Sequence, residues 1–195
     1  NYVPVGEDQK QHIELARDVA QKFNNDYKTE IFPMPEPMIF GEATRVMSLK
    51  DGLNKMSKSD PSENARINMT DGPDEIARKI KKATSDSELL PGNPKDLLGR
   101  PEAKNLMEIY ASLSNQNVAT ACAKFEGKQF SFFKKDLTEL AISVLGPIGV
   151  EMARLVSDEG YLDSVLEDGS RRASMIANKV LSEVYDTVGF LRTDY

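Results

Sequence analysis

Apolar residues recur every three or four positions between Glu7 and Phe23, and polar residues fill the positions between them. This spacing predicts an amphipathic helix with one apolar face. The preceding stretch, Tyr2 to Val5, is short and mostly apolar and is followed by Gly6, which predicts a buried strand ending in a turn. Strand, glycine turn and helix form half of a βαβ unit. The apolar helix positions are Ile13, Ala16, Val19, Ala20 and Phe23.

Turn formers and prolines separate this helix from a second short strand. Residues 24–26, Asn-Asn-Asp, predict the end of the helix. The prolines of FPMPEP, residues 32–37, predict a stiff extended connector that excludes helix. Residues 45–49 are a strand candidate, and the Asp-Gly pair at 51–52 predicts a tight turn. The chain then enters NKMSKSD, residues 54–60, which is cationic, rich in hydroxyl groups and has one apolar residue.

From residue 71 onward the pattern is helical. Asp71-Gly72-Pro73-Asp74 predicts a helix start, with an acidic capping residue and a proline in the first turn. Four or five further amphipathic helices are predicted, and the last is capped by Ser170 and ends at Gly189. In the helix that starts at residues 71–74, Ile76, Ile80 and Ala83 are predicted to face inward. Its exposed side is mostly covered by basic residues, Arg78, Lys79, Lys81 and Lys82.

The order of the elements predicts an α/β fold followed by an all-α region, with the boundary between residues 72 and 73. Periodicity does not decide whether the final helix belongs to the helical region or packs back onto the α/β part. Two or three strands are fewer than a covered parallel sheet normally needs. We therefore expect that the strand at residue 2 has no neighbour within the chain and that a further α/β segment precedes Asn1.

Composition indicates a globular protein without membrane-spanning segments. The chain has 195 residues, 39% hydrophobic and 29% charged, and a net charge of −6. Its single cysteine and single histidine argue against a disulfide and a zinc site, so we expect no bound metal and a cytoplasmic location. Residues 45–84 nevertheless carry nine Lys and Arg against six Asp and Glu, an excess of +3. A solvated helix face explains such an excess unless a motif indicates otherwise.

Two stretches suggest chemistry. In VGEDQKQH, residues 5–12, a glycine at a strand end precedes a helix whose amides and dipole favour an anionic ligand. Asp8 and Gln9 would reach ribose hydroxyls or a polar substrate, although an ordinary strand-to-helix turn explains the same residues. In KMSKS, residues 55–59, two lysines on flexible stems could follow a departing pyrophosphate, and the serines add neutral donors. A solvated surface loop is the alternative for an arbitrary pair of lysines.

The full pentapeptide resembles the signature loop of the class I aminoacyl-tRNA synthetases, in the form NKMSKSDPSENARINMTD. VPVGEDQKQH followed by IELARDVAQKFN is similar to the tryptophanyl-tRNA synthetase family, as are DEIARKIKKATSDSE and GSRRASMIANKVLSEVYDTVGF. The resemblance runs in order along essentially the whole chain. It implies that residues 1–72 are the carboxyl-terminal part of a Rossmann-type nucleotide-binding domain. It also implies that residues 73–195 form an α-helical domain that contacts the tRNA anticodon region.

The resemblance also implies an activity and a set of site residues. The reaction would join L-tryptophan to ATP, with Mg²⁺, to give tryptophanyl-adenylate, and then transfer the amino acid to tRNA(Trp), in a homodimeric enzyme. Lys55 and Lys58 would be catalytic, and Gln9 would face the tryptophan. The residues matching the ATP-binding positions are Gly6, Glu7, Asp8, Val46, Lys55, Met56, Ser57, Lys58 and Ser59.

The sequence also departs from the family pattern. The HIGH-type signature is absent, and His12 in KQHIEL cannot supply it because no glycine follows, so we interpret His12 as a helix-surface residue. Cys122 lies in the apolar run VATACAKF and is interpreted as core packing. Without the HIGH-containing half, the 195 residues alone are expected to be inactive. A tyrosyl-type or other nucleotidyltransferase of the same superfamily, and a non-catalytic tRNA-binding helical module, remain alternatives.

Overall fold

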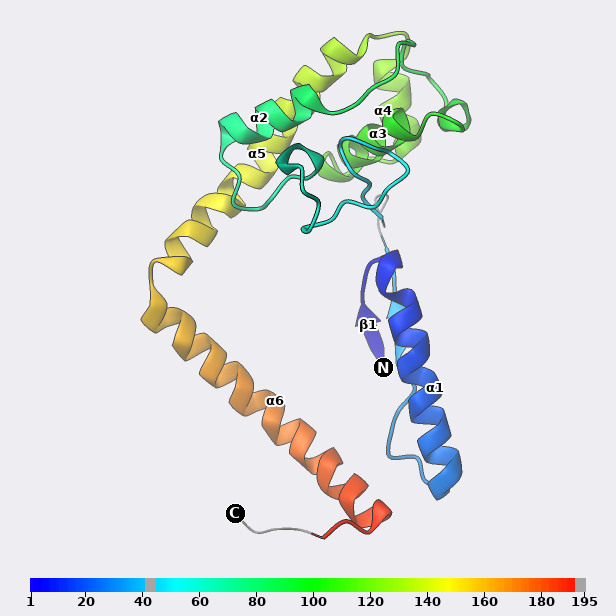
Figure 1. The fold of residues 1–195 in the computed structure, drawn as a ribbon, viewed down its shortest axis with the longest axis vertical. Coiled ribbons are helices and arrows are strands. Elements are labelled where there is room, and N and C mark those ends of the chain that lie inside the picture. The colour runs from blue at the N-terminus through cyan, green and yellow to red at the C-terminus, as the bar shows by residue number, and fades with distance from the viewer. Residues whose placement is uncertain (41–44, 192–195) are drawn as a thin grey trace. The chain divides into compact units, whose positions relative to one another are not determined.

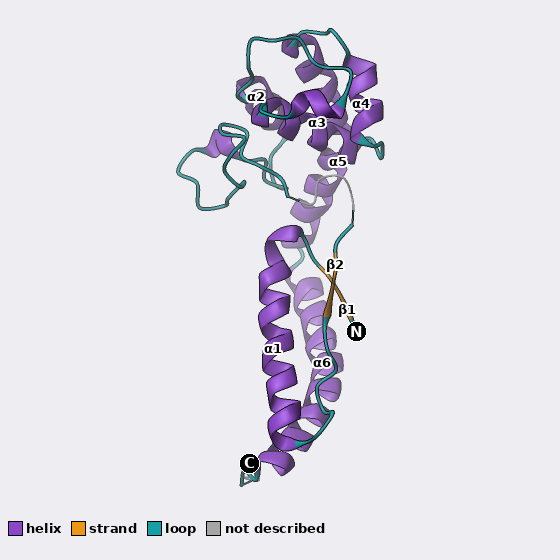
Figure 2. Ribbon diagram, turned by 90° about the vertical axis from the view of Figure 1, so that its right-hand side faces the viewer, coloured by secondary structure: helices purple, strands orange, loops and turns teal. Residues whose placement is uncertain are grey.

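The computed structural model describes residues 1–40 and 45–191. Contacts divide the chain into two units, Asn1–Ile39 with Leu155–Tyr195, and Phe40–Arg154, and we describe each unit by itself (Figure 1). The family-based division at residue 72 assigns domains by function, and it stays a prediction. The described part is mostly helical with one small parallel sheet (Figure 2), which agrees with the predicted order of α/β first and helices afterwards.

In the first unit, β1 (Tyr2–Pro4) pairs in parallel with β2 (Glu36–Met38), and Val3 lies opposite Pro37. The expectation that the strand at residue 2 lacks a neighbour was therefore wrong. Its partner lies in the proline-rich connector, which remains extended as predicted. Proline at the middle position of β2 is tolerated because this strand pairs with β1 alone in the described sheet.

Helix α1 spans Lys10–Tyr27, later at both ends than predicted. Its first predicted turn is a separate 3-10 helix, Glu7–Gln9. The helix continues through Asn24, because the side chain of Asn24 binds the connector instead of ending the helix. Its Nδ2 donates to the Phe32 carbonyl at 2.8 Å, and its Oδ1 accepts from the Phe32 N–H at 3.2 Å. The helix ends at Lys28, which adopts a left-handed conformation with φ of 52°.

Helix α6 (Glu159–Val188) belongs to the same unit. It begins after Asp158, whose carboxylate accepts the Tyr161 N–H at 3.1 Å, and it ends at Gly189 with φ of 79°. The predicted glycine end is confirmed. The predicted cap at Ser170 was wrong, because Ser170 lies within α6 and the acidic Asp158 supplies a cap twelve residues further back.

The second unit packs helices around an apolar core, in which the rings of Tyr110, Phe125 and Phe133 meet at centroid distances of 4.8 to 5.8 Å. Cys122 lies in this core, fully buried as predicted, whereas His12 of α1 is exposed as predicted. The elements of the unit are the 3-10 helix Glu63–Ala65, α2 (Pro73–Lys82), the 3-10 helix Pro94–Leu97, α3 (Pro101–Leu113), α4 (Val118–Phe125) and α5 (Phe130–Val156).

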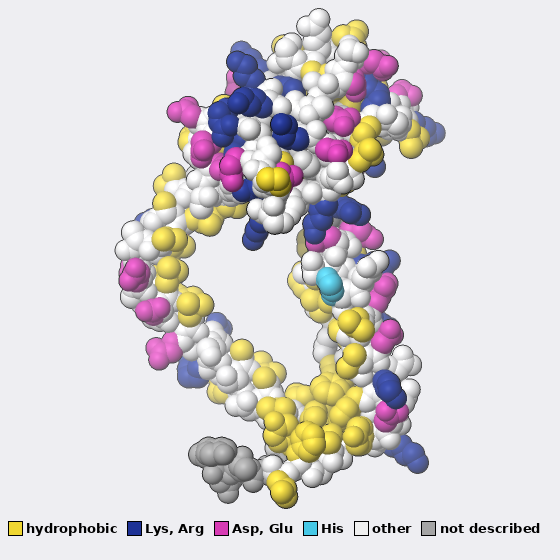
Figure 3. Space-filling model, viewed as in Figure 1, with side chains coloured by type: hydrophobic (Ala, Val, Ile, Leu, Met, Phe, Trp, Pro, Cys, Tyr) yellow, Lys and Arg dark blue, Asp and Glu magenta, His cyan; other side chains and the backbone are white. Residues whose placement is uncertain are grey.

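Helix α2 begins as predicted, but Gly72 rather than Asp71 is its capping residue, and no side chain caps it. Ile76, Ile80 and Ala83 are buried, as the periodicity predicted. Lys79 was expected on the exposed face and is instead buried, with 1% of its surface exposed. The other basic residues of this segment are at the surface, and Figure 3 shows Lys and Arg side chains gathered over α2.

Among the described helices, none is by itself long and apolar enough to cross a membrane. Helices α5 and α6 pass that test only when taken together as a bent pair, on length and composition alone.

Candidate nucleotide-binding site

The KMSKS segment begins at a narrow antiparallel turn. Met47 and Lys55 form an isolated bridge, and the Met56 N–H donates to the Val46 carbonyl at 3.1 Å. Asp51 closes the turn, since its Oδ1 accepts the Leu53 N–H at 2.9 Å. The strand predicted at residues 45–49 is reduced to this bridge. Its pairing nevertheless fixes where the KMSKS segment starts.

The lysines of the segment reach solvent while its methionine points to the protein. Lys55 and Lys58 are exposed, whereas Met56 is partly buried and packs against the apolar core. Ser57 and Ser59 bring their hydroxyl oxygens within 2.9 Å of each other, and the Ser59 N–H donates to Ser57 Oγ at 3.3 Å. The segment thus presents two cations and a hydroxyl pair on a backbone held by the bridge to Met47 and by the apolar contact of Met56, an arrangement suited to binding phosphates.

Asn105 of α3 holds the stem of this turn. Its side-chain Oδ1 accepts the Met47 N–H at 2.9 Å, and its Nδ2 donates to the carbonyls of Met47 at 2.9 Å and Ser48 at 3.3 Å. Asn105 is only 2% exposed, so these bonds are shielded from water. A Cβ added at Gly52 would lie 2.4 Å from the Pro101 carbonyl carbon, so only glycine fits where the turn meets α3.

The loop that carries the KMSKS segment runs from the stem to Asp71, just before α2, and a buried ion pair holds this far end. Asp71 accepts from the Lys79 ammonium and from the Asn68 N–H, the latter at 2.8 Å, and both members of the pair are nearly inaccessible. Burial raises the pKa of the Asp71 carboxyl. The hydrogen bonds from Lys79 and Asn68 and the charge of Lys79 outweigh this effect, so the pKa lies below its ordinary value. Asp71 therefore stays ionised and ties the end of the loop to α2.

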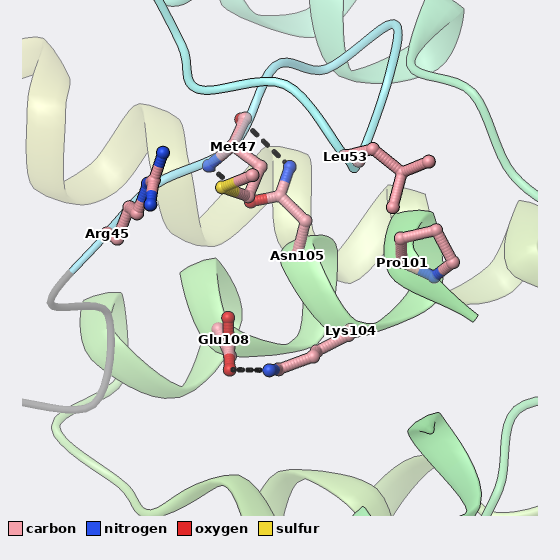
Figure 4. Close-up of a pocket in the computed structure, with 8 residues that line it drawn as sticks. Arg45, Met47, Leu53, Pro101, Lys104, Asn105 and Glu108 are labelled. Atoms are coloured by element: carbon pink, nitrogen blue, oxygen red, sulfur yellow. Dashed lines mark hydrogen bonds and ion pairs between the residues drawn. The ribbon is translucent and has the colours of Figure 1, made fainter. Parts of the chain in front are cut away.

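A cavity of about 340 Å³ lies between the stem and α3 (Figure 4). Lys104 and Glu108 lie along α3, with 3.7 Å between Nζ and Oε1. Val46, the predicted adenine contact, is 36% exposed and is not part of the cavity wall. The lining residues are Arg45, Met47, Gly52, Leu53, Pro101, Lys104, Asn105 and Glu108.

The predicted residues of VGEDQKQH belong to the first unit. Gly6 is extended, with φ of −77°, so its backbone does not require glycine, and its carbonyl accepts the Gln9 N–H at 3.0 Å. Glu7, Asp8 and Gln9 are exposed on the 3-10 turn, and the Gln9 amide donates to Asp8 Oδ2 at 3.0 Å. These residues cluster with one another, and the KMSKS residues cluster separately in the second unit.

Three residues that position the loop were not recognised as site residues from the sequence: Asn105, Asp71 and Lys79. The first is an asparagine inside an apolar helical run, which is a detectable signal because buried amides require partners. The other two carried no comparable signal. In the described part of the chain, no group of three His, Cys, Asp or Glu side chains is arranged to hold a metal ion.

The Gly-Glu-Asp-Gln turn and the anchored KMSKS loop both lie within the first 146 residues of the chain. The sequence profile of the tRNA synthetases of class I (W and Y) matches residues 1–146. The chain belongs to this family.

Within this family, the chain is similar to tryptophan–tRNA ligases. The chain is 51% identical to the tryptophan–tRNA ligase of Agrobacterium fabrum over 98% of the chain and 59% of the relative, and 50% identical to that of Brucella melitensis. It thus spans about 59% of the length of these relatives.

Solved structures agree with this placement. The tryptophanyl-tRNA synthetase from Mycoplasma pneumoniae superposes with a TM-score of 0.83 at 29% identity, covering 98% of this chain and 58% of that one. The enzyme from Campylobacter jejuni in complex with ADP and tryptophan gives 0.63 at 28% identity, covering 97% and 57%.

Proposed function

We propose that this chain contributes to an enzyme that activates L-tryptophan with MgATP and transfers it to tRNA(Trp). The observation that carries the proposal is a KMSKS loop with exposed lysines and with both of its ends fixed by buried polar groups. The 51% identity to a tryptophan–tRNA ligase supports tryptophan as the amino acid. The Campylobacter jejuni enzyme, solved with ADP and tryptophan, supports an adenine nucleotide as the other ligand.

In the proposed reaction the tryptophan carboxylate attacks the α-phosphate of ATP, the bond to the β-phosphate breaks, and pyrophosphate leaves with its negative charge. Lys55 and Lys58 interact with that charge as it develops, because an ammonium group on a long stem can move with the leaving group. Met56, Ser57 and Ser59 complete the loop around the triphosphate. Mg²⁺ enters as part of the MgATP substrate.

The remaining predicted residues have roles at the nucleotide and the amino acid. We assign Gly6, Glu7 and Asp8 to ATP and Gln9 to tryptophan, and Val46 to the face of the adenine. The exposure of the charged and amide members on a turn after a strand fits this assignment, since open α/β sheets bind ligands there. The intact enzyme is proposed to be a cytoplasmic homodimer.

Tryptophan-dependent exchange between ATP and pyrophosphate tests the proposal. In the full-length protein that carries this chain, Lys55→Ala and Lys58→Ala should each slow exchange by about 100-fold or more, as expected when a group that stabilises developing charge is removed. Lys50→Ala is the matched control, because Lys50 is also exposed but lies outside the KMSKS segment. Undiminished exchange in both loop variants would refute the proposal.

The same assay separates the alternatives. Exchange that depends on tyrosine instead of tryptophan would support the alternative of a tyrosyl-type enzyme. Unchanged adenylate formation with weakened tRNA binding in the Lys55 and Lys58 variants would support a tRNA-binding module. We expect the 195 residues alone to give no exchange above background, and exchange at the full-length rate would contradict the assignment of the catalytic parts.

A further inference from the structure

A second cavity, of about 600 Å³, lies between α2 and α5 within the second unit. We call it the α2–α5 pocket. Three lysines and one glutamate line it, so its charged side chains sum to +2 in a chain whose net charge is −6. One of these lysines, Lys81, lies in the last turn of α2, the helix over which Figure 3 shows Lys and Arg side chains gathered. Its lining residues are Ala77, Lys81, Ser85, Phe130, Ser131, Lys134, Lys135, Thr138 and Glu139.

The three lysines of this pocket lack anionic partners among the described residues, where no carboxylate oxygen lies within 4.0 Å of any of their ammonium groups. Lys134 is partly buried, and its Nζ donates to the Ala83 carbonyl at 2.6 Å and to the Ser85 hydroxyl at 3.3 Å. Lys81 and Lys135 are exposed at the rim. Most other buried or partly buried cations of this unit, such as Lys79 and Arg100, are paired with carboxylates.

The walls of the pocket favour an anion with many acceptor oxygens. Burial lowers the pKa of Lys134, and a bound anion would offset that desolvation. Ser131 is exposed and also lines the pocket, so its hydroxyl adds a neutral donor. Phe130 is only 8% exposed and belongs to the apolar core, so its ring is not available for stacking on a base.

We propose that the α2–α5 pocket binds a backbone phosphate of an RNA through Lys81, Lys134 and Lys135. The proposal rests on the proposed function, which makes a tRNA the RNA concerned. Because the pocket offers cations and hydroxyls without an available aromatic face, it contributes to affinity in a manner independent of base sequence.

The salt dependence of tRNA binding tests the pocket. Fluorescence anisotropy of a labelled tRNA(Trp) transcript is measured from about 50 to about 300 mM KCl with the full-length protein, because each lost phosphate contact lowers the slope of log K against log salt by about 0.7 to about 0.9. The double variant Lys81→Gln/Lys135→Gln removes the two rim cations and spares the hydrogen bonds of Lys134. The control Lys95→Gln/Lys179→Gln removes the same charge from exposed lysines that do not line the pocket.

The pocket variant should make the slope less steep by about 0.8, the share of one phosphate contact, and near 0.15 M salt it should bind about 4-fold to about 6-fold more weakly if affinities converge near 1 M. Lys81→Arg/Lys135→Arg should retain the slope of the unmodified protein. An unchanged slope in the glutamine variant, or an equal loss in the control, would overturn the proposal. Displacement of the tRNA by polyglutamate as efficiently as by unlabelled RNA of equal charge would overturn the assignment to RNA.

Tryptophan-dependent exchange, which needs no tRNA, separates this proposal from the preceding one. Normal exchange together with an unchanged salt slope refutes only the pocket. Absence of exchange in the unmodified protein refutes the proposed function, whatever the salt slope shows.

Discussion

Replacing Asn105 with leucine tests whether the KMSKS loop depends on buried hydrogen bonds at its stem. Leucine has a similar volume and suits a helix, so α3 itself should tolerate the change. The substitution removes all three hydrogen bonds between the asparagine side chain and the backbone of Met47 and Ser48. One N–H and two carbonyls of the stem lose their partner.

The magnitude follows from those orphaned groups. A buried polar group left without a partner costs about 1 to about 3 kcal/mol. Ser48 is buried and Met47 is partly buried, so water can replace some of the lost bonds at Met47 only. The greater apolarity of leucine recovers part of the loss. Three such groups would cost about 3 to about 9 kcal/mol without compensation, and with the two compensations we expect Asn105→Leu to lower the free energy of unfolding by roughly 3 kcal/mol, the low end of that range.

Urea unfolding monitored by circular dichroism measures this change, and tryptophan-dependent exchange in the full-length protein measures its effect on the loop. The matched control is Lys104→Leu, one residue earlier on α3, where the side chain is exposed. A surface change of this kind should stay within about 0.5 kcal/mol. If Asn105→Leu unfolds at the same urea concentration as the control and exchanges at the normal rate, the amide does not hold the stem.

Two further substitutions and one labelling experiment probe the Asp71 end of the KMSKS loop, the turn at Gly52 and the apolar core. Asp71→Asn leaves Lys79 buried without an anion and should cost roughly 3 to roughly 5 kcal/mol in urea unfolding at neutral pH. In the folded state the pKa of Asp71 lies below its ordinary value of 3.8. The stabilisation from ionised Asp71 is therefore fully present above pH 3.8 and is lost as the pH falls through the lower pKa of the folded state. The stability of Asp71→Asn should not show this loss. Gly52→Ala places a Cβ 2.4 Å from the Pro101 carbonyl carbon and should lower the melting temperature, unlike Gly146→Ala within α5, where nothing lies within 4 Å. Cys122 is fully buried, so a thiol reagent should label it only as fast as the protein unfolds, and rapid labelling in native buffer would contradict its place in the core. Burial also raises the pKa of its thiol, which further lowers its reactivity.

Periodicity predicted which face of α2 is buried, because the spacing of apolar residues alone decides that face. It did not predict the burial of Lys79. A helical pattern counts lysine as polar, and only the fold brings Asp71, eight residues earlier, to its ammonium group. The end of α1 was mispredicted for a related reason. Asn24 is a turn former in isolation, but its amide binds Phe32 eight residues later and leaves the helix free to continue.

The candidate site likewise contains residues that the sequence identifies and residues that only the fold brings to it. Its KMSKS residues are contiguous, so a sequence motif is sufficient to name them. The residue that holds the stem, Asn105, lies 58 positions after Met47, and no local spacing connects the two. The parallel pairing of β1 with a strand containing Pro37 was missed because proline in a short segment indicates a loop. Proline is tolerated in β2 because, in the described sheet, β2 pairs with β1 alone.

In the proposed function the KMSKS loop closes over a substrate and then releases the product, and buried polar anchors at its ends suit that motion. Apolar contacts tolerate sliding, whereas a buried amide or carboxylate is satisfied only by particular partners, so Asn105 and Asp71 fix the register of the two loop ends. Between them, the partial burial of Met56 is the apolar contact that holds the KMSKS segment itself. Under the proposed function, motion confined between fixed ends would let Lys55 and Lys58 follow a phosphate without displacing the helices that carry the anchors.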